Sequence, residues 1–194
     1  MKLLSFILFS IICNCCFLTG VHSEIPESEP GMPPLSESFI ERYYEMKAAY
    51  PEMTSLFGPY AASSYTQGKF IERYFEIKYI HPSLVTLHAR YAASENTMDN
   101  FMTKYYEIRD SYPALVDYFG FYAGSRKTLV EFMTRYYQIK DSAPELAECF
   151  GHFAASSIDL PEFSARYYGI KASNTGMQNC FGDYAASFRK LLAK

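Results

Sequence analysis

The sequence predicts an all-α protein, a tandem array of five αα-hairpin repeats of 31 residues each. Three observations support this: a fixed repeat period, apolar residues at helical spacing, and short turns. One phrase recurs without insertion or deletion, as FIERYYEMK, FIERYFEIK, FMTKYYEIR, FMTRYYQIK and FSARYYGIK, beginning at Phe39, Phe70, Phe101, Phe132 and Phe163. A second phrase follows each copy in register and ends in YAAS, YAAS, YAGS, FAAS and YAAS.

The first phrase of each repeat is expected to form an amphipathic helix. Its apolar residues recur at the spacing that places side chains on one helix face, as in Phe132, Tyr136, Ile139 and Ala143. Thr128 with Glu131, and Asp159 with Glu162, match the capping box, in which a side-chain oxygen and a glutamate satisfy backbone N–H groups. The sequence therefore predicts helix starts near Thr66, Thr97, Thr128 and Asp159.

The second phrase is expected to form a second helix that packs antiparallel to the first, because the turn between them is short. Ser142 through Glu145 resembles another cap, with Pro144 in the first turn, where its missing N–H costs little. The predicted core stripe of this helix is Leu146, Cys149, Phe150, Phe153 and Ala154.

Small residues in the second helix predict two local features. Gly151 and Ala155 form an edge of small residues that would let a neighbouring backbone approach closely. In the first repeat Gly58 and Pro59 interrupt this pattern, and a kink or an early helix end is expected there.

Stacking of the hairpins is expected, because one hairpin alone cannot bury its wide apolar face. The sequence allows two architectures, a short right-handed α-solenoid or a closed helical array, within one domain at residues 36–194. Phe188, Leu191 and Leu192 are predicted to extend the last helix and to close the C-terminal end.

Residues 1–23 are predicted to be a removable signal peptide, which would make the protein secreted and extracellular. Lys2 precedes a short apolar run, and small residues occupy the cleavage positions Val21 and Ser23, so the mature chain would begin at Glu24. A membrane anchor is the alternative, but the run is short for a span of roughly 20 residues. No second apolar run follows, so no transmembrane segment is expected, and residues 24–35 form an acidic, proline-rich leader.

Charge and cysteine content restrict the function further. Without Lys2 the chain keeps 17 basic against 21 acidic residues with the signs interspersed, which argues against nucleic acid as a partner. Cys149 and Cys180 remain after signal removal and occupy the same column, so a disulfide between them is predicted for a secreted protein. Two buried free thiols are the alternative, because packed helices lie about 8–10 Å apart and a disulfide needs Cα atoms within about 7 Å.

Catalytic and metal-binding patterns are missing from the sequence. It contains no nucleophile elbow, zinc-protease, P-loop or dinucleotide-binding motif. His81 and His88 lie seven residues apart, but no cysteine or carboxylate cluster accompanies them at ligand spacing, and His152 stands in a column of unlike residues. We therefore expect no enzyme activity, no metal and no cofactor.

Two further columns on the first helix are candidate ligand-binding positions. One is aromatic and lies about 100° around the helix from the core tyrosines: Tyr44, Phe75, Tyr106, Tyr137 and Tyr168. The other is basic in every repeat: Lys47, Lys78, Arg109, Lys140 and Lys171. These cations would either cover aromatic rings near the helix C-terminus or form a ladder that binds an acidic partner surface or an anionic lipid head group.

The function hypothesis from the sequence is a secreted, non-catalytic helical-repeat protein that binds an extracellular protein partner. One alternative is a carrier of a hydrophobic small molecule or lipid in a pocket between helices, and another is a tyrosine-rich extracellular structural protein. A closed, dry apolar cavity of several hundred Å³ would favour the carrier.

Overall fold

The computed structural model describes residues 38–189, and these residues confirm the predicted all-α fold of helical hairpins. The first helices of the hairpins are α1 (Phe39–Ala49), α3 (Gln67–Ile80), α5 (Met98–Ser111), α7 (Leu129–Ser142) and α9 (Leu160–Ser173). The second helices are α2 (Phe57–Ala62), α4 (Val85–Ala93), α6 (Phe119–Gly124), α8 (Phe150–Ala155) and α10 (Phe181–Ala186). Short 3₁₀ helices precede four of these: η1 (Thr54–Leu56), η2 (Pro113–Tyr118), η3 (Pro144–Cys149) and η4 (Thr175–Cys180). The expected signal peptide and leader, Leu191 and Leu192 lie outside the described residues.

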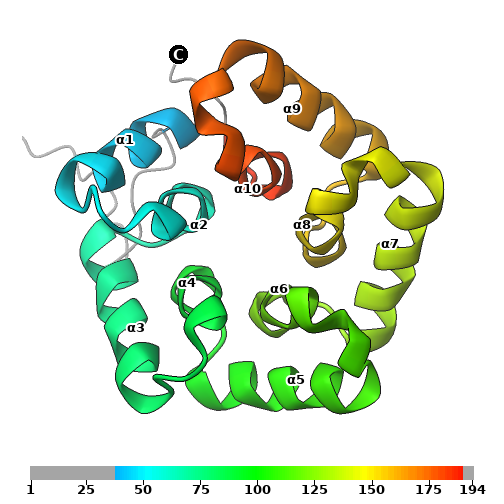
Figure 1. The fold of residues 1–194 in the computed structure, drawn as a ribbon, viewed down its shortest axis with the longest axis horizontal. Coiled ribbons are helices and arrows are strands. Elements are labelled where there is room, and N and C mark those ends of the chain that lie inside the picture. Colours follow the sequence, from blue (N-terminus) through cyan, green and yellow to red (C-terminus); the bar gives the residue numbers. More distant parts are fainter. Residues whose placement is uncertain (1–37, 190–194) are drawn as a thin grey trace, which may run out of the picture.

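The hairpins close into a ring, with the first helices on the perimeter and the second helices around the axis (Figure 1). Each inner helix packs against the inner helices of both neighbouring repeats, and α10 packs against α2 as α4 packs against α6. Of the two architectures that the sequence allows, the closed helical array is therefore correct. Among residues 38–189, no helix has the length and hydropathy needed to cross a membrane.

The same aromatic contact joins each repeat to the next, including the last to the first. An inner-helix ring meets the leading Phe of the following repeat edge-on: Tyr60 with Phe70, Tyr91 with Phe101, and Phe153 with Phe163, at 5.3–5.4 Å between centroids. At the seam between repeats 5 and 1, Tyr184 meets Phe39 at 5.4 Å. The five leading phenylalanines are fully buried, so this contact closes the ring within a continuous core.

The predicted starts of the first helices are confirmed. The side chains of Thr66, Thr97, Thr128 and Asp159 each accept a hydrogen bond from the backbone N–H three residues later. The capping box at Thr128 is complete, because Glu131 also accepts from the Thr128 N–H at 2.8 Å. At Asp159 the Glu162 backbone N–H donates to the Asp159 side chain at 2.9 Å, which is the first bond of the expected box. The Glu162 carboxylate lies 4.0 Å from Arg166.

The second helices begin differently from the sequence prediction. Ser142 does not cap a helix: it is the last residue of α7, and η3 begins at Pro144 without a side-chain cap. Leu146 departs from helical geometry (φ −93°, ψ 30°), so a 3₁₀ turn precedes the short α8. The predicted core stripe is nevertheless buried, from Leu146 to Ala154.

The expected kink or early end at Gly58 and Pro59 was wrong. α2 continues through both residues to Ala62 and is as long as α6, α8 and α10. Pro59 is the third residue of α2, where the backbone N–H has no partner within the helix, so proline removes no hydrogen bond.

The C-terminal end closes by a different contact from the predicted one. Phe188 follows the end of α10 and is 81% exposed, so the prediction that it extends the helix was wrong. Arg189 instead donates from Nε and Nη2 to the Ser63 carbonyl at 3.1 and 3.0 Å, linking repeat 5 to repeat 1. Asn96 makes a similar link from repeat 2 to the carbonyls that end α6.

Candidate functional site

One column of the inner helices holds a different residue in every repeat: Pro59, Arg90, Phe121, His152 and Asp183. Arg90 of repeat 2 contacts His152 of repeat 4 and Asp183 of repeat 5, although these repeats are not adjacent to repeat 2. The column therefore converges on the ring axis. We call Arg90, Phe121, His152 and Asp183 the axial cluster.

A column of small residues lets the axial side chains pack against the neighbouring inner helix. An added Cβ on Gly151 would lie 2.6 Å from the Phe121 ring, and one on Gly182 would lie 2.7 Å from the His152 ring. At the seam an added Cβ on Gly58 would lie 2.2 Å from the Asp183 carboxylate. The expected edge of small residues is thus present, and the preceding repeat's axial side chain fills the space.

Replacing Gly182 by Ala is expected to lower the free energy of unfolding by about 1–3 kcal/mol, because the His152 ring, whose side chain is only 12% exposed, has little freedom to move away. Gly169→Ala is the matched control, since Gly169 is exposed within α9 with open space around its Cα. That change should stabilise the fold by up to about 1 kcal/mol. Urea unfolding of both variants measures the difference, and equal effects would contradict the close packing at Gly182.

Charge and ring contacts hold the axial cluster together. Arg90 Nη1 donates to Asp183 Oδ1 at 2.6 Å, and the guanidinium lies 3.9 Å from the Phe121 ring centroid. Arg90 Nη2 lies 3.2 Å from His152 Nε2, and the Phe121 and His152 rings are 4.5 Å apart. His152 Nε2 also lies 3.4 Å from Asp183 Oδ1, so this nitrogen faces both members of the ion pair.

The pKa values within the cluster reflect burial and the neighbouring charges. Burial alone would raise the pKa of Asp183, but Arg90 and His152 outweigh it and lower the pKa to about 2. Burial lowers the pKa of His152, and the opposing attraction of Asp183 does not compensate. At neutral pH the cluster therefore contains one ion pair and a neutral imidazole.

The His152 shift predicts that the protein becomes less stable as the pH falls below about 6.5, the usual histidine pKa. Because the folded-state pKa lies below the unfolded-state pKa, the unfolded chain binds more protons, and stability is lost as the pH drops through this interval. Urea unfolding at pH 7.5 and 5.5 should show the loss. His152→Phe should reduce it and His81→Gln should leave it unchanged; an unchanged pH dependence in His152→Phe would contradict the assignment.

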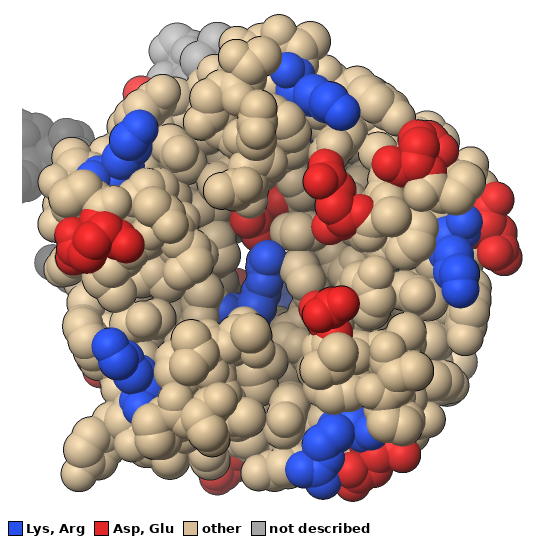
Figure 2. Space-filling model, in the orientation of Figure 1, with Lys and Arg blue, Asp and Glu red and all other residues tan. Residues whose placement is uncertain are grey.

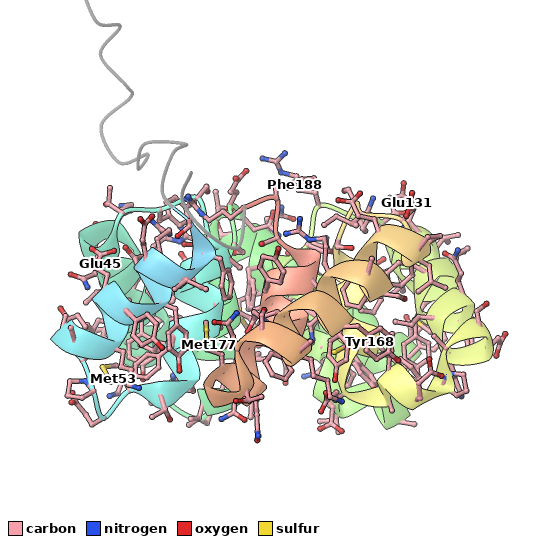
Figure 3. The ribbon with its side chains drawn as sticks, turned by 90° about the horizontal axis from the view of Figure 1, so that it is seen from above. Glu45, Met53, Glu131, Tyr168, Met177 and Phe188 are labelled. Carbon is pink, nitrogen blue, oxygen red and sulfur yellow. The ribbon has the colours of Figure 1, made fainter. Side chains whose placement is uncertain are left out.

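Above the axial cluster, the ring opens into a hollow of about 440 Å³, which we call the cup. The axial cluster forms its floor, and Glu95, Arg126, Ser157 and Phe188, which share one column of repeats 2 to 5, lie around it. Phe188 lies at one edge of the ring, and Met53 and Met177 lie toward the other (Figure 3). The cup therefore opens at the end where the inner helices terminate.

A second hollow of about 270 Å³ contains Arg90 and Asp183 as well, together with Pro59 and Asn179. The view along the axis shows basic and acidic side chains at the bottom of the central hollow (Figure 2). Because Arg90 and Asp183 line both hollows, their ion pair lies between the cup and this second hollow.

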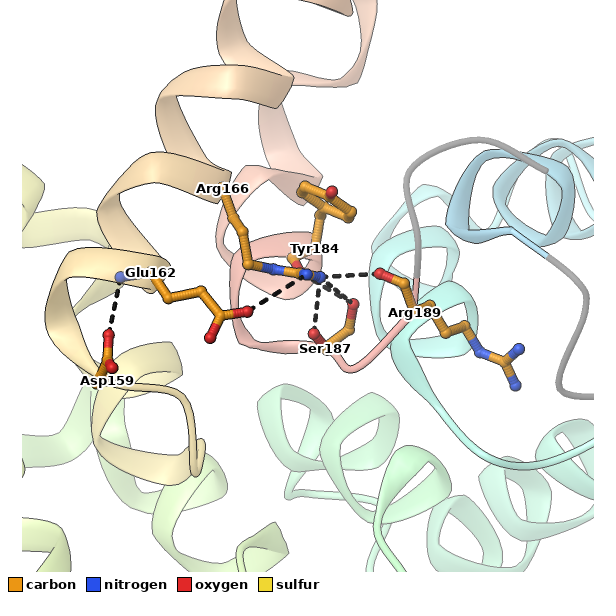
Figure 4. A network of polar contacts seen from close by, with 6 residues as sticks. All are labelled: Asp159, Glu162, Arg166, Tyr184, Ser187 and Arg189. Atoms are coloured by element: carbon orange, nitrogen blue, oxygen red, sulfur yellow. Dashed lines mark hydrogen bonds and ion pairs between the residues drawn. The ribbon is translucent and has the colours of Figure 1, made fainter. Parts of the chain in front are cut away.

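A basic column that sequence reasoning missed, buried at Arg42 and partly buried in the other repeats, anchors the ends of the inner helices. Its members are Arg42, Arg73, Lys104, Arg135 and Arg166. Arg166, for example, donates from Nη2 to the carbonyls of Tyr184, Ser187 and Arg189 at 3.1, 2.7 and 2.8 Å (Figure 4). The signal was present in the sequence as the basic residue three positions after each leading Phe, which helical spacing places on the same face.

The predicted outer columns form a belt on the ring perimeter. The aromatic members Tyr44, Tyr106, Tyr137 and Tyr168 are about half exposed. The cations lie over aromatic rings, from Arg109 at 4.6 Å above Tyr106 to Lys140 at 5.8 Å above Tyr137. The expected cation–π contacts are present, and binding of an acidic surface or a lipid head group by Lys47, Lys78, Arg109, Lys140 and Lys171 stays a prediction.

Cys149 and Cys180 are free, buried thiols in the structure, so the disulfide expected from the sequence is not formed in it. Burial raises the pKa of each thiol to about 12, which makes both unreactive. We expect thiol titration of residues 24–194 to find two sulfhydryls after unfolding without reductant, and almost none before. A chain without titratable thiols would show that the disulfide forms.

His88 Nε2 lies 2.9 Å from the His81 carbonyl oxygen, so this ring nitrogen contacts the backbone of His81. Residues 38–189 contain no group of three His, Cys, Asp or Glu side chains that could hold a metal ion.

No protein family, curated protein or solved structure matches this chain.

Proposed function

We propose that this chain is a secreted, non-catalytic binding protein that holds a protein partner at the cup. The observation that carries the proposal is the contrast between columns. The leading Phe, the small residues and the cation three positions after each leading Phe recur around the ring, whereas the axial column holds a different residue in every repeat and the rim column holds Ser64, Glu95, Arg126, Ser157 and Phe188. A scaffold needs only the recurring residues, so the unlike residues that face the cup are free to form a functional surface.

The charged residues that line the cup favour a protein surface over a lipid. The rim carries Arg126, which is 80% exposed and paired with Glu95, beside the exposed ring of Phe188. Exposed aromatic and arginine side chains are the residues that protein interfaces use as anchors. A lipid carrier needs a closed apolar cavity, but the cup and the second hollow both contain charged residues.

The serines beside the axial cluster support a non-catalytic role. Ser63, Ser94, Ser125, Ser156 and Ser187 are buried, and each hydroxyl donates to the carbonyl three residues earlier at 2.8–2.9 Å. These hydroxyls act as helix-end hydrogen-bond donors. A nucleophile would instead need its proton directed at a base such as His152.

The test is affinity capture from extracellular fluid of the source organism with three immobilised proteins. They are the wild type, a cup variant (Arg126→Glu with Phe188→Ala), and a belt variant (Lys78→Met, Arg109→Met and Lys140→Met). Both variants change exposed side chains, so both should fold. We expect a protein that the wild type and the belt variant retain and the cup variant loses.

Two results would contradict the proposal. Loss of the partner by the belt variant alone would place the binding site on the perimeter. Extraction of a bound lipid from the captured wild type, with no protein, would favour the carrier.

A further inference from the structure

A third hollow, of about 410 Å³, lies at the seam between repeats 5 and 1, away from the axial cluster. It is bounded by Tyr43, Lys47 and Phe57 of repeat 1 and by η4 of repeat 5, including Met177 and Cys180. Because the ring is built from repeats, the interfaces between repeats 3 and 4 and between repeats 4 and 5 show two ways in which this position is covered.

At the interface between repeats 3 and 4, a tyrosine ring occupies the corresponding place. Tyr118 of repeat 3 packs edge-on against Tyr136 at 5.1 Å, and Tyr136 packs against Phe150 at 5.8 Å. At the seam Tyr43 and Phe57 make the same pair at 5.4 Å, but Cys180 stands in the column of Tyr118. The seam therefore lacks the third ring of this aromatic group.

At the interface between repeats 4 and 5, carboxylates cover the corresponding position. Glu148 accepts a hydrogen bond from Tyr167, and Glu145 accepts one from Tyr168 at 3.4 Å. In repeat 5 the same two columns hold Asn179 and Gly176, which are shorter and uncharged. The seam therefore has neither the tyrosine of repeat 3 nor the two glutamates of repeat 4.

We propose that the seam hollow binds a small aromatic anion, whose ring takes the place that Tyr118 fills between repeats 3 and 4. Tyr43, Phe57 and Met177 supply aromatic and sulfur contacts for that ring. Lys47 is the one charged side chain among the described residues that line the hollow, so the acid group of the ligand lies beside it. The volume falls within the range of about 300–1,000 Å³ that is usual for ligand pockets.

The probe is 8-anilino-1-naphthalenesulfonate, a fluorescent aromatic anion, with N-phenyl-1-naphthylamine as its uncharged counterpart. The wild type should bind the anion saturably at one site. Cys180→Tyr, which restores the residue of repeat 3, should weaken binding by at least about tenfold. The double variant Gly176→Glu with Asn179→Glu restores the residues of repeat 4, and it provides the same test if Cys180→Tyr does not fold.

A matched pair of lysines tests the charge. Lys47→Met should weaken binding of the anion by about fivefold and leave the neutral probe unaffected. Lys140 occupies the same column at a closed interface, so Lys140→Met should change neither. The proposal is overturned if no saturable binding occurs, if both filling changes leave affinity unchanged, or if Lys47→Met and Lys140→Met behave alike.

Discussion

Asp183→Asn is expected to lower the free energy of unfolding by about 3 kcal/mol at pH 7. Asparagine keeps the shape of the side chain and removes the charge that pairs with Arg90. The guanidinium would then remain at the ring axis, only 24% exposed, without its counter-charge. The pKa of about 2 for Asp183 indicates the same order of stabilisation, which is complete above about pH 4 and is lost as the pH falls toward 2.

Urea unfolding at pH 7 measures this effect, with Asp141→Asn as the control. Asp141 is exposed near the end of α7, so its replacement should leave stability nearly unchanged. If Asp183→Asn cost no more than the control, the axial ion pair would not contribute to the fold.

Arg135→Met is expected to cost a similar amount, about 3 kcal/mol. Methionine keeps the apolar stem but removes the donors that reach the carbonyls of Phe153 and Ile158 at 3.1 and 2.5 Å. Hydrogen bonds from a charged donor contribute about 1.5–3 kcal/mol each. The Phe153 carbonyl would keep its hydrogen bonds from Ser156, but the Ile158 carbonyl, which follows α8, would lose its charged donor. Burial lowers the pKa of Arg135, and the neighbouring charge of Asp159 opposes this shift.

Lys140→Met on the same helix is the matched comparison. Lys140 is exposed and contacts only the outer faces of Tyr136 and Tyr137 at 5.8 Å. Its loss should change stability far less than the loss of Arg135. Equal costs would mean that the two basic columns do not differ in structural role.

The sequence was sufficient for the repeat, the hairpins and the starts of the first helices because these depend on local patterns. A threonine or aspartate side chain caps a helix by accepting a hydrogen bond from the backbone N–H three residues later, so it needs no distant partner. The second helices were less predictable. Ser142 is a residue type that often caps a helix, yet α7 continues through it. A kink was expected at Pro59, but this residue lies in the first turn of α2, where proline is tolerated.

Ring closure was not predictable, because it depends on a small rotation between repeats that no local pattern encodes. This also concealed the candidate site. His152 stood visibly in a column of unlike residues, but nothing in a linear array would bring it to Arg90 of repeat 2. Likewise the two basic columns, represented by Arg135 and Lys140, are equally regular in the sequence. Only their position relative to the inner helix makes the first an anchor for that helix and leaves the second exposed on the ring perimeter.

The central claim is that five hairpins form a closed ring whose axis brings repeats 2 and 5 into contact. A double-mutant cycle with Arg90→Met and Asp183→Asn tests it most directly, because these residues are 93 positions apart and would not meet in an open array. The closed ring predicts a coupling energy of about 1–3 kcal/mol between the two changes, measured by urea unfolding. Additive effects, within about 0.5 kcal/mol, would contradict the ring and favour the open solenoid.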